Sequence, residues 1–228
     1  MTSEALVADI GRDDGPDAVT GTVTGNRFAG RVRYKFWTSL TNTGNEYFGG
    51  NPQTVSIELS SDETFAGKTW DNNTYWQDAE GDAPTSFGTV QAAPIGGQEW
   101  TFANWKATTG YDAHSTFTAT LPTGQRITVN PSAFTPGRAH VAVFNWSGAT
   151  TATLDLSGVL TVGHTYQILN ACDFYGPPVQ TGTYAGGTLT VTLPATVTPV
   201  AAVGGSTNPA PNIAPTFYAF VVLDSSAQ

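Results

Sequence analysis

Five chemically capable side chains lie close together in the segment FANWKATTGYDAHSTF, which spans residues 102–117. They are Trp105, Lys106, Tyr111, Asp112 and His114. An imidazole that a carboxylate orients can serve as a general base, and a phenol or an ammonium group can supply the matching proton. On this hypothesis His114 is the base and Asp112 orients it. Either Tyr111 or Lys106 is then the acid.

The same segment also suits a structural turn. Trp105 would pack over the end of a stack of strands, and Gly110 would reverse the chain. Asp112 and His114 would hydrogen-bond the backbone of the connection that follows. We favour this structural interpretation, because no nearby motif supplies the second carboxylate or the metal site that catalysis needs. Trp105, Tyr111, Asp112 and His114 are therefore candidate ligand-contact or hinge residues, and no catalytic residue is assigned.

Composition argues against several classes of function. The chain of 228 residues carries 9 basic and 18 acidic residues, which gives a net charge of −9. A protein that tracks nucleic-acid phosphates needs a basic face, so no nucleic-acid partner is expected. The single Cys172 cannot form an intramolecular disulfide and is expected to act as a small apolar residue. Residues 1–17 lack the pattern of a secretion signal, and no stretch reaches membrane-spanning length. We therefore expect a soluble protein without a membrane partner, made without secretion unless a leader has been removed.

No motif predicts a metal or a cofactor. The acidic, glycine-containing segments 11–17 and 78–82 could hold Ca²⁺, but neither matches an EF-hand loop, and solvated turns are the expected structure. His140 and His164 lack partners at the spacing of metal ligands. The P-loop, G-x-S-x-G and H-E-x-x-H motifs do not occur in the sequence.

Periodicity predicts a nearly all-β chain. Six segments after Leu121 are rich in β-branched and aromatic residues and are separated by Gly, Pro, Asn or Ser. They are residues 125–130, 138–146, 151–157, 165–171, 187–193 and 217–223. Because so many strands fall in half of the chain, we interpret this half as an antiparallel β-sandwich. One short helix, ended by Gly110, is expected within residues 98–110.

The first half carries a loose repeat, in which an asparagine is followed two residues later by an aromatic residue. The three copies are TGNRFAG at 24–30, TGNEYFG at 43–49 and DNNTYWQ at 71–77. The asparagines Asn26, Asn45 and Asn73 are separated by 19 and 28 residues. Such repeats are typical of a solenoid of stacked coils, in which each coil buries its apolar edge against its neighbours. The open ends of so short a solenoid need caps or partner chains.

The order of four segments along the chain resembles that of a known family of proteins. An NNTYW segment is followed by FANWKATTGYDAHST, then by the strand-rich region that begins FTPGRAHVAVFNW, and finally by FYAFVVL. Over residues 70–223 this order resembles the C-terminal end of bacterial right-handed parallel β-helix proteins of the pectate-lyase-like kind. The resemblance implies a few short right-handed β-helix coils over residues 1–120 and an antiparallel β-sandwich over residues 121–228. It brings no catalytic residue, because the upstream coils that hold the catalytic groups of such enzymes have no counterpart here.

Two functions of different class follow. We favour a non-enzymatic structural or adhesive protein, a phage virion component such as a capsid decoration protein or a small spike, at the virion surface. We expect a homo-oligomer, a trimer, in contact with other virion proteins, because such an assembly would cover the open solenoid edges. The alternative is an extracellular, carbohydrate-binding, non-catalytic C-terminal part of a polysaccharide lyase or glycosidase. Aromatic side chains could then stack on sugar rings, although most are expected in the core. The candidates are Trp37, Trp70, Tyr75, Trp76, Trp100 and Trp146.

The segment 194–217 is a further expected contact region. It contains five Pro residues before Phe217 and a Gly-Gly pair, which make it neither a good strand nor a typical solvated linker. Its apolar residues would be costly to leave in water. We therefore expect this segment to lie as an extended arm against a neighbouring subunit or the underlying shell.

Overall fold

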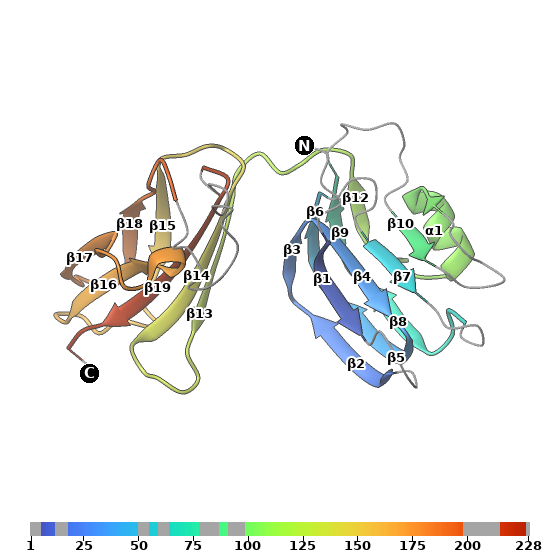
Figure 1. Cartoon of the computed structure of the whole chain (residues 1–228), viewed down its shortest axis with the longest axis horizontal. Coiled ribbons are helices and arrows are strands. Elements are labelled where there is room, and N and C mark those ends of the chain that lie inside the picture. Colours follow the sequence, from blue (N-terminus) through green and yellow to red (C-terminus); the bar gives the residue numbers. More distant parts are fainter. Residues whose placement is uncertain are drawn as a thin grey trace, which may run out of the picture. The chain divides into compact units, whose positions relative to one another are not determined.

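The structure, a computed structural model, describes residues 6–11, 18–49, 55–58, 64–77, 87–90, 99–197 and 215–226 (Figure 1). Most of these residues form β-strands and one short α-helix is present among them, so the expectation of a nearly all-β chain is confirmed. The chain divides into two compact units, Met1–Leu121 (unit 1) and Pro122–Gln228 (unit 2), and the boundary expected after residue 120 falls beside this division. The described part of the chain holds no helix with the length and apolarity of a membrane span.

The described residues of unit 1 form three sheets. Sheet A has the order β1 (Leu6–Gly11), β4 (Arg31–Lys35), β7 (Val55–Glu58), β10 (Phe87–Val90) and β11 (Glu99–Trp100). Sheet B has the order β2 (Ala18–Thr24), β5 (Trp37–Thr43) and β8 (Lys68–Asp71). Sheet C has the order β3 (Arg27–Ala29), β6 (Glu46–Phe48), β9 (Thr74–Trp76) and β12 (Thr116–Thr118).

The chain visits the three sheets in turn, and each complete visit is here called a circuit. The first three circuits are β1–β2–β3, β4–β5–β6 and β7–β8–β9. Within each sheet, strands of successive circuits pair in parallel. In the fourth circuit, β10 is followed by the antiparallel β11 and by helix α1 (Phe102–Thr109), and the chain then enters sheet C as β12. Apart from β11, the strands of the first half therefore pair in parallel, whereas those of the second half pair antiparallel.

Aromatic side chains fill the interior of unit 1. Phe28, Tyr47 and Tyr75 occupy equivalent positions in sheet C, and their rings stack with centroids 5.3 and 5.0 Å apart. The hydroxyls of Tyr34 and Tyr47 lie 2.7 Å apart, and both side chains are fully buried. Stacked rings bury a large apolar area, and a buried phenol needs such a hydrogen-bond partner. The repeated aromatic residue of the sequence thus forms the core of this unit.

Helix α1 lies next to the last circuit. The Thr101 hydroxyl caps its first turn, and Gly110 ends it with the left-handed φ of 74° that glycine adopts at low cost. Trp105 is the buried residue of the helix, and its ring centroid lies 5.9 Å from that of Trp70 on β8. The short helix expected within residues 98–110 is therefore confirmed.

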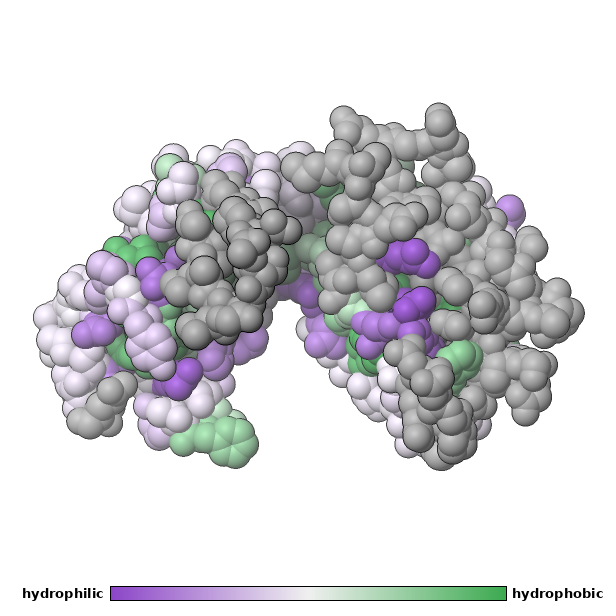
Figure 2. Space-filling view, in the orientation of Figure 1, coloured by the Kyte–Doolittle hydropathy of each residue, from purple (hydrophilic) through white to green (hydrophobic). Residues whose placement is uncertain are grey.

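Paired charges occur on sheet A. Asp9 on β1 contacts both Arg33 and Lys35 on β4, in each case with a nitrogen-to-oxygen distance of 2.7 Å. Figure 2 shows hydrophilic side chains gathered over this part of unit 1. Lys35 is almost completely buried, and a buried ammonium group requires such a carboxylate partner.

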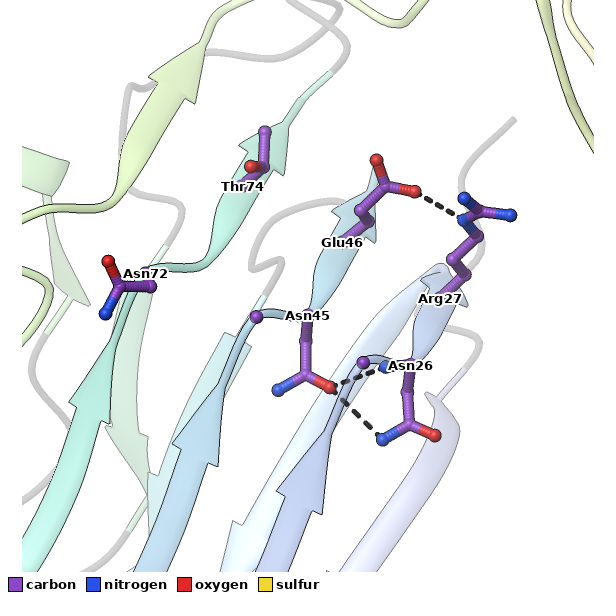
Figure 3. Close-up of a pocket in the computed structure, with 8 residues that line it drawn as sticks. Asn26, Arg27, Asn45, Glu46, Asn72 and Thr74 are labelled. Atoms are coloured by element: carbon purple, nitrogen blue, oxygen red, sulfur yellow. Dashed lines mark hydrogen bonds and ion pairs between the residues drawn. The ribbon is translucent and has the colours of Figure 1, made fainter.

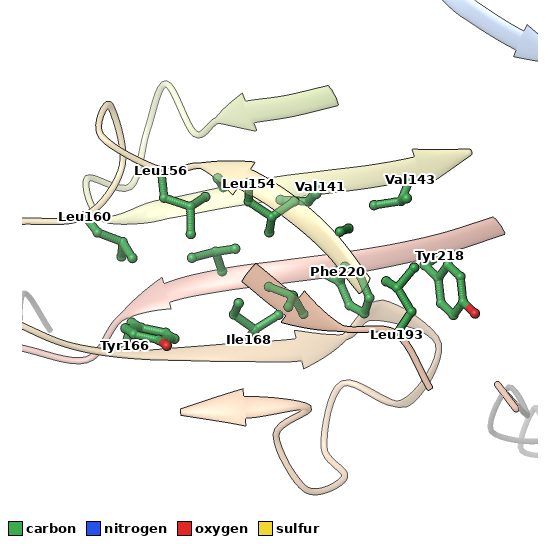
Figure 4. Close-up of a cluster of buried hydrophobic side chains, with 14 of the residues drawn as sticks. Val141, Val143, Leu154, Leu156, Leu160, Tyr166, Ile168, Leu193, Tyr218 and Phe220 are labelled. Atoms are coloured by element: carbon green, nitrogen blue, oxygen red, sulfur yellow. The ribbon is translucent and has the colours of Figure 1, made fainter. Parts of the chain in front are cut away.

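The described residues of unit 2 form two antiparallel sheets. Sheet D has the order β13 (Gln125–Pro131), β14 (Arg138–Asn145), β19 (Phe217–Asp224), β16 (Thr165–Asn170) and β17 (Gln180–Thr183). Sheet E pairs β15 (Thr151–Asp155) with β18 (Thr188–Thr192). Alternate residues of these strands are buried, for example Ala152 and Leu154 on β15 and Val141 and Val143 on β14. They meet in one core between the two sheets (Figure 4).

Cys172 lies in the 3-10 helix η1 (Ala171–Asp173), where it is free and packs half-buried against the core of unit 2. This is the small apolar role expected for it. Three expected features lie wholly or mostly outside the described residues, namely most of the acidic segment 11–17, the acidic segment 78–82 and most of the arm over residues 194–217.

Candidate functional site

A row of stacked side chains runs along the corner between sheets B and C. This asparagine corner comprises residues 25–26, 44–45, 72–73 and 114–115, one pair from each circuit. Oδ1 of Asn45 accepts a hydrogen bond from the backbone N–H of Asn26 at 2.9 Å (Figure 3). Oδ1 of Asn73 accepts one from the N–H of Asn45, also at 2.9 Å. The asparagine side chains thus accept hydrogen bonds from backbone N–H groups at the corner, which lie outside the strands and have no partner there from a neighbouring strand.

Backbone conformation explains why the corner recurs. Its first residue is left-handed in three circuits, with φ of 66° at Gly25, 66° at Gly44 and 57° at Asn72. Glycine and asparagine adopt this conformation at the lowest cost. In these circuits two residues separate the strand of sheet B from the strand of sheet C, so the asparagines fall in register.

The ladder continues into the fourth circuit, where a serine replaces the asparagine. Oγ of Ser115 accepts a hydrogen bond from the N–H of Asn73 at 2.8 Å, and Phe117 lies opposite Tyr75. The three copies expected from the sequence are therefore followed by a fourth, HSTF at 114–117, which sequence reasoning missed. The sequence feature that indicates this fourth copy is the aromatic residue two positions after Ser115, at the same spacing as in the other three copies.

Asp112 anchors this end of the ladder. Its carboxylate is completely buried and accepts hydrogen bonds from Ser115 Oγ at 2.6 Å, Trp105 Nε1 at 2.8 Å and the Tyr75 hydroxyl at 3.1 Å. Asn73 Nδ2 donates a further bond at 3.2 Å. A carboxylate can be buried only with such a set of donors. Asp112 therefore connects the ladder, the aromatic core and helix α1.

Burial dominates the titration of this cluster. It raises the pKa of the Asp112 carboxyl above its ordinary value, although the hydrogen bonds from Ser115 and Trp105 oppose the shift. Burial, together with the neighbouring Asp112 carboxylate, also raises the pKa of the Tyr75 phenol well above its ordinary value. Both side chains are fully buried, so neither is exposed to a molecule bound at the surface.

His114 pairs with Asp71 and not with Asp112. Its Nδ1 lies 2.6 Å from Asp71 Oδ2, its backbone N–H donates to Oδ1 at 2.7 Å, and 76% of its side chain is exposed. Partial burial raises the pKa of the Asp71 carboxyl. The side-chain and backbone hydrogen bonds from His114 outweigh that effect, so the pKa is lower than its ordinary value.

The candidate residues of segment 102–117 are thus divided between the interior and the surface. The Tyr111 hydroxyl donates to the carbonyl oxygen of Phe65 at 2.5 Å, and Lys106 Nζ donates to the carbonyl oxygen of Ala113 at 3.1 Å. With Asp112 in the interior and His114 exposed, the base and its expected orienting carboxylate are not brought together.

The structural interpretation of the segment is correct for two residues and wrong in detail for two others. Trp105 is buried against the last circuit and Gly110 reverses the chain, as expected. Asp112 and His114 were expected to bond the backbone of the following connection. The Asp112 carboxylate instead collects side-chain donors, because the interior offers no water to solvate it, and His114 binds the Asp71 carboxylate.

The other histidines lie in unit 2. His164 Nδ1 is 2.9 Å from Oδ2 of the buried Asp224, which also accepts the N–H of Ser226 at 3.0 Å. His140 is exposed on β14. Within the described ranges, no three His, Cys, Asp or Glu residues are placed to hold a metal ion.

Two of the six aromatic candidates for sugar stacking lie in the interior. Trp70 and Tyr75 are buried, whereas Trp37, Trp76, Trp100 and Trp146 are half-buried. Trp37 also donates its Nε1 to the carbonyl oxygen of Ile10 at 2.9 Å.

A polar cavity of about 320 Å³ opens beside the asparagine corner (Figure 3). Its side-chain lining is Asn26, Arg27, Asn45, Glu46, Asn72 and Thr74. Arg27 and Glu46 face each other across neighbouring strands as an ion pair of 2.5 Å. Sequence reasoning noticed the asparagines but not this cavity, because the residues around them lie on three different circuits.

Comparison of the chain with protein families, with characterised proteins and with solved structures gave no match.

Proposed function

We propose that the chain is a non-enzymatic structural or adhesive protein that docks on, or is displayed from, a larger assembly. In this proposal unit 1 is a short right-handed parallel β-helix that serves as a platform, and unit 2 is an antiparallel β-sandwich that serves as a docking module. The assembly we favour is a phage virion, with the chain as a capsid decoration protein or a small spike at its surface.

The observation that supports the proposal is the difference between the two ends of unit 1. At one end β1, β2 and β3 are the outermost strands of their sheets, and no described strand pairs with their outer edges. At the other end β11, β8 and β12 are outermost, and helix α1 packs there through Trp105, which contacts Trp70. A helix therefore packs against the second end, whereas no described strand extends the first.

Unpaired strand edges bind further strands readily, because their N–H and C=O groups lack partners. A neighbouring subunit that covers β1, β2 and β3 would supply those partners. We propose a homotrimer in contact with other virion proteins, since closed symmetric assembly is the usual way in which proteins cover such surfaces.

Light scattering of the full chain in solution tests the oligomer. A mass three times the 23.9 kDa of the chain is expected, and a monomer at micromolar concentration contradicts the trimer. Thr22→Lys places a charge on the edge strand β2 and should weaken association. Thr38→Lys on the interior strand β5 is the matched control. Equal effects of the two variants would argue against the edge as the interface.

A second candidate function is favoured by the polar cavity at the asparagine corner. The chain would then be the extracellular, carbohydrate-binding, non-catalytic part of a polysaccharide lyase or glycosidase. The neighbouring genes separate the two candidates. Phage structural genes support the virion component, whereas an in-frame upstream extension of many coils supports the enzyme part.

A further inference from the structure

We infer that the asparagine corner binds a neutral, linear oligosaccharide in the cavity lined by Asn26, Arg27, Asn45, Glu46, Asn72 and Thr74. The inference stands on this cavity and does not depend on the assembly proposed above. Four properties of the cavity support it, namely its room, its hydrogen-bonding groups, its charge and its spacing.

Room for a ligand arises from the absence of side chains at two corner positions. A Cβ built at Gly25 or at Gly44 meets no heavy atom within 4 Å. The volume of about 320 Å³ falls at the lower end of the range for small-molecule sites, which begins at roughly 300 Å³. The cavity is therefore large enough to receive a sugar ring.

The cavity combines a rigid wall with available polar groups. Asn45 is buried and its amide is committed, because Nδ2 donates to Asn42 Oδ1 at 2.6 Å and to the Val23 carbonyl oxygen at 2.9 Å. Among the described residues, none hydrogen-bonds the Asn72 carboxamide or the Thr74 hydroxyl. A carboxamide and a hydroxyl both donate and accept, as sugar hydroxyls do. The buried Asn45 can therefore keep a fixed position while the side chains of Asn72 and Thr74 hydrogen-bond a ligand.

Charge favours a neutral ligand. The two ionised residues of the lining, Arg27 and Glu46, neutralise each other across a distance of 2.5 Å. The net charge of −9 over the whole chain also repels polyanions at long range. An acidic polysaccharide or a nucleic acid would find no excess positive charge here.

The spacing of the lining suits a linear polymer. Arg27, Glu46 and Thr74 occupy equivalent positions on β3, β6 and β9. Neighbouring strands lie about 4.7–4.9 Å apart, which is close to the length of one pyranose unit in a glycan chain. A chain that runs across the strands would therefore meet an equivalent polar position at each successive sugar.

Saturation-transfer NMR on the full chain tests the inference. The neutral probes are linear hexasaccharides of glucose, mannose, galactose and N-acetylglucosamine, and the anionic probes are hexagalacturonate and a single-stranded DNA oligomer. At least one neutral probe should receive saturation from the protein. Asn72→Gly keeps a residue that tolerates the left-handed backbone and removes the carboxamide, so it should weaken binding roughly threefold to tenfold, the effect of one hydrogen bond.

Two further variants keep the result interpretable. Gly44→Asn copies the residue found at the equivalent position 72, so it suits the left-handed backbone while it fills the cavity, and it should weaken binding at least as much. Thr38→Ala, at an exposed position of β5, should leave binding unchanged. The inference is wrong if no neutral probe binds, if an anionic probe binds more tightly, or if Asn72→Gly and Gly44→Asn both bind as the unchanged chain does. Light scattering reports assembly separately, so failure of either proposal can be recognised without the other.

Discussion

The backbone N–H of Asn45 donates a 2.9 Å hydrogen bond to Oδ1 of Asn73, although 28 residues separate the two in the chain. Asn73 in turn donates its own N–H to Ser115, across a further 42 residues. Each ladder residue therefore fixes the circuit before it. The stability of unit 1 depends on side chains that lie outside its strands.

Replacement of the central ladder residue should be costly. Asn73→Ala leaves the buried N–H of Asn45 and the Asn42 carbonyl oxygen without their partners, so we expect a loss of roughly 2–4 kcal/mol in the free energy of unfolding. Asn26→Ala at the exposed end of the ladder is the control and should cost less than about 1 kcal/mol. Chemical denaturation measures both, and equal losses would contradict the ladder's role.

Trp105 should stabilise unit 1 through packing and through its N–H. Trp105→Ala is expected to cost roughly 3–5 kcal/mol, as for other buried large aromatic residues, and to weaken cooperative unfolding. Trp105→Phe keeps an aromatic ring but removes the donor to Asp112, so its cost should be smaller, about 1–3 kcal/mol. If Trp105→Ala left stability unchanged and lowered glycan binding instead, the residue would be a sugar contact.

The buried carboxylate should make stability depend on pH in a particular direction. Because the pKa of Asp112 is higher in the folded chain than its ordinary value of 3.8, the folded state binds this proton more tightly than the unfolded state does. Protonated Asp112 therefore contributes fully to the free energy of unfolding below pH 3.8. This contribution is lost as the pH rises through the pKa of Asp112 in the folded chain. Asp112→Asn removes this titration, so the stability difference between the unchanged chain and the variant should shrink from acidic to neutral pH. Urea denaturation at several pH values measures the difference, and one that grew with pH would contradict the assignment.

Asp71 should show the opposite dependence. Its pKa is lowered in the folded chain, so its contribution is present above the ordinary value of 3.8 and is lost as the pH falls through the folded-state pKa. His114→Ala removes the partner at the surface and should cost less than about 1 kcal/mol at neutral pH. The same variant should lose less stability than the unchanged chain on acidification. An identical acid response in both proteins would show that the pair does not stabilise the fold.

No cleavage of acidic or neutral polysaccharides is expected from the chain, because His114 and Asp112 are separated between the surface and the interior. Reducing-end release and the absorbance of unsaturated products measure hydrolysis and elimination. A rate that disappears in His114→Ala, with the fold retained, would overturn the proposed non-enzymatic function.

Strand positions in unit 2 could be read from the sequence. The six expected segments coincide with β13, β14, β15, β16, β18 and β19, because their alternating residues face one core. Strand β17 was missed. Its sequence, QTGT, holds no large apolar residue, and it forms by pairing with β16 at the edge of sheet D.

The contacts within unit 1 were harder to predict from the sequence, because they join residues of different circuits. The spacing of Asn26, Asn45 and Asn73 predicted stacked repeats, and hydrogen bonds join these residues. The role of Asp112 could not be predicted, since a carboxylate is ordinarily exposed and its donors come from positions as distant as Asn73 and Tyr75. The pairing of His114 with Asp71 was missed for the same reason, because 43 residues separate them.

The constant corner limits where this fold can accept foreign sequence. Successive ladder residues are 19, 28 and 42 positions apart, yet in the first three circuits the corner itself is always two residues long. In the first three circuits the added length therefore falls outside this corner, in the segments that join sheet C to sheet A and sheet A to sheet B. Peptide epitopes grafted in those segments should leave the stack intact, whereas the same graft at residues 44–45 would divide it.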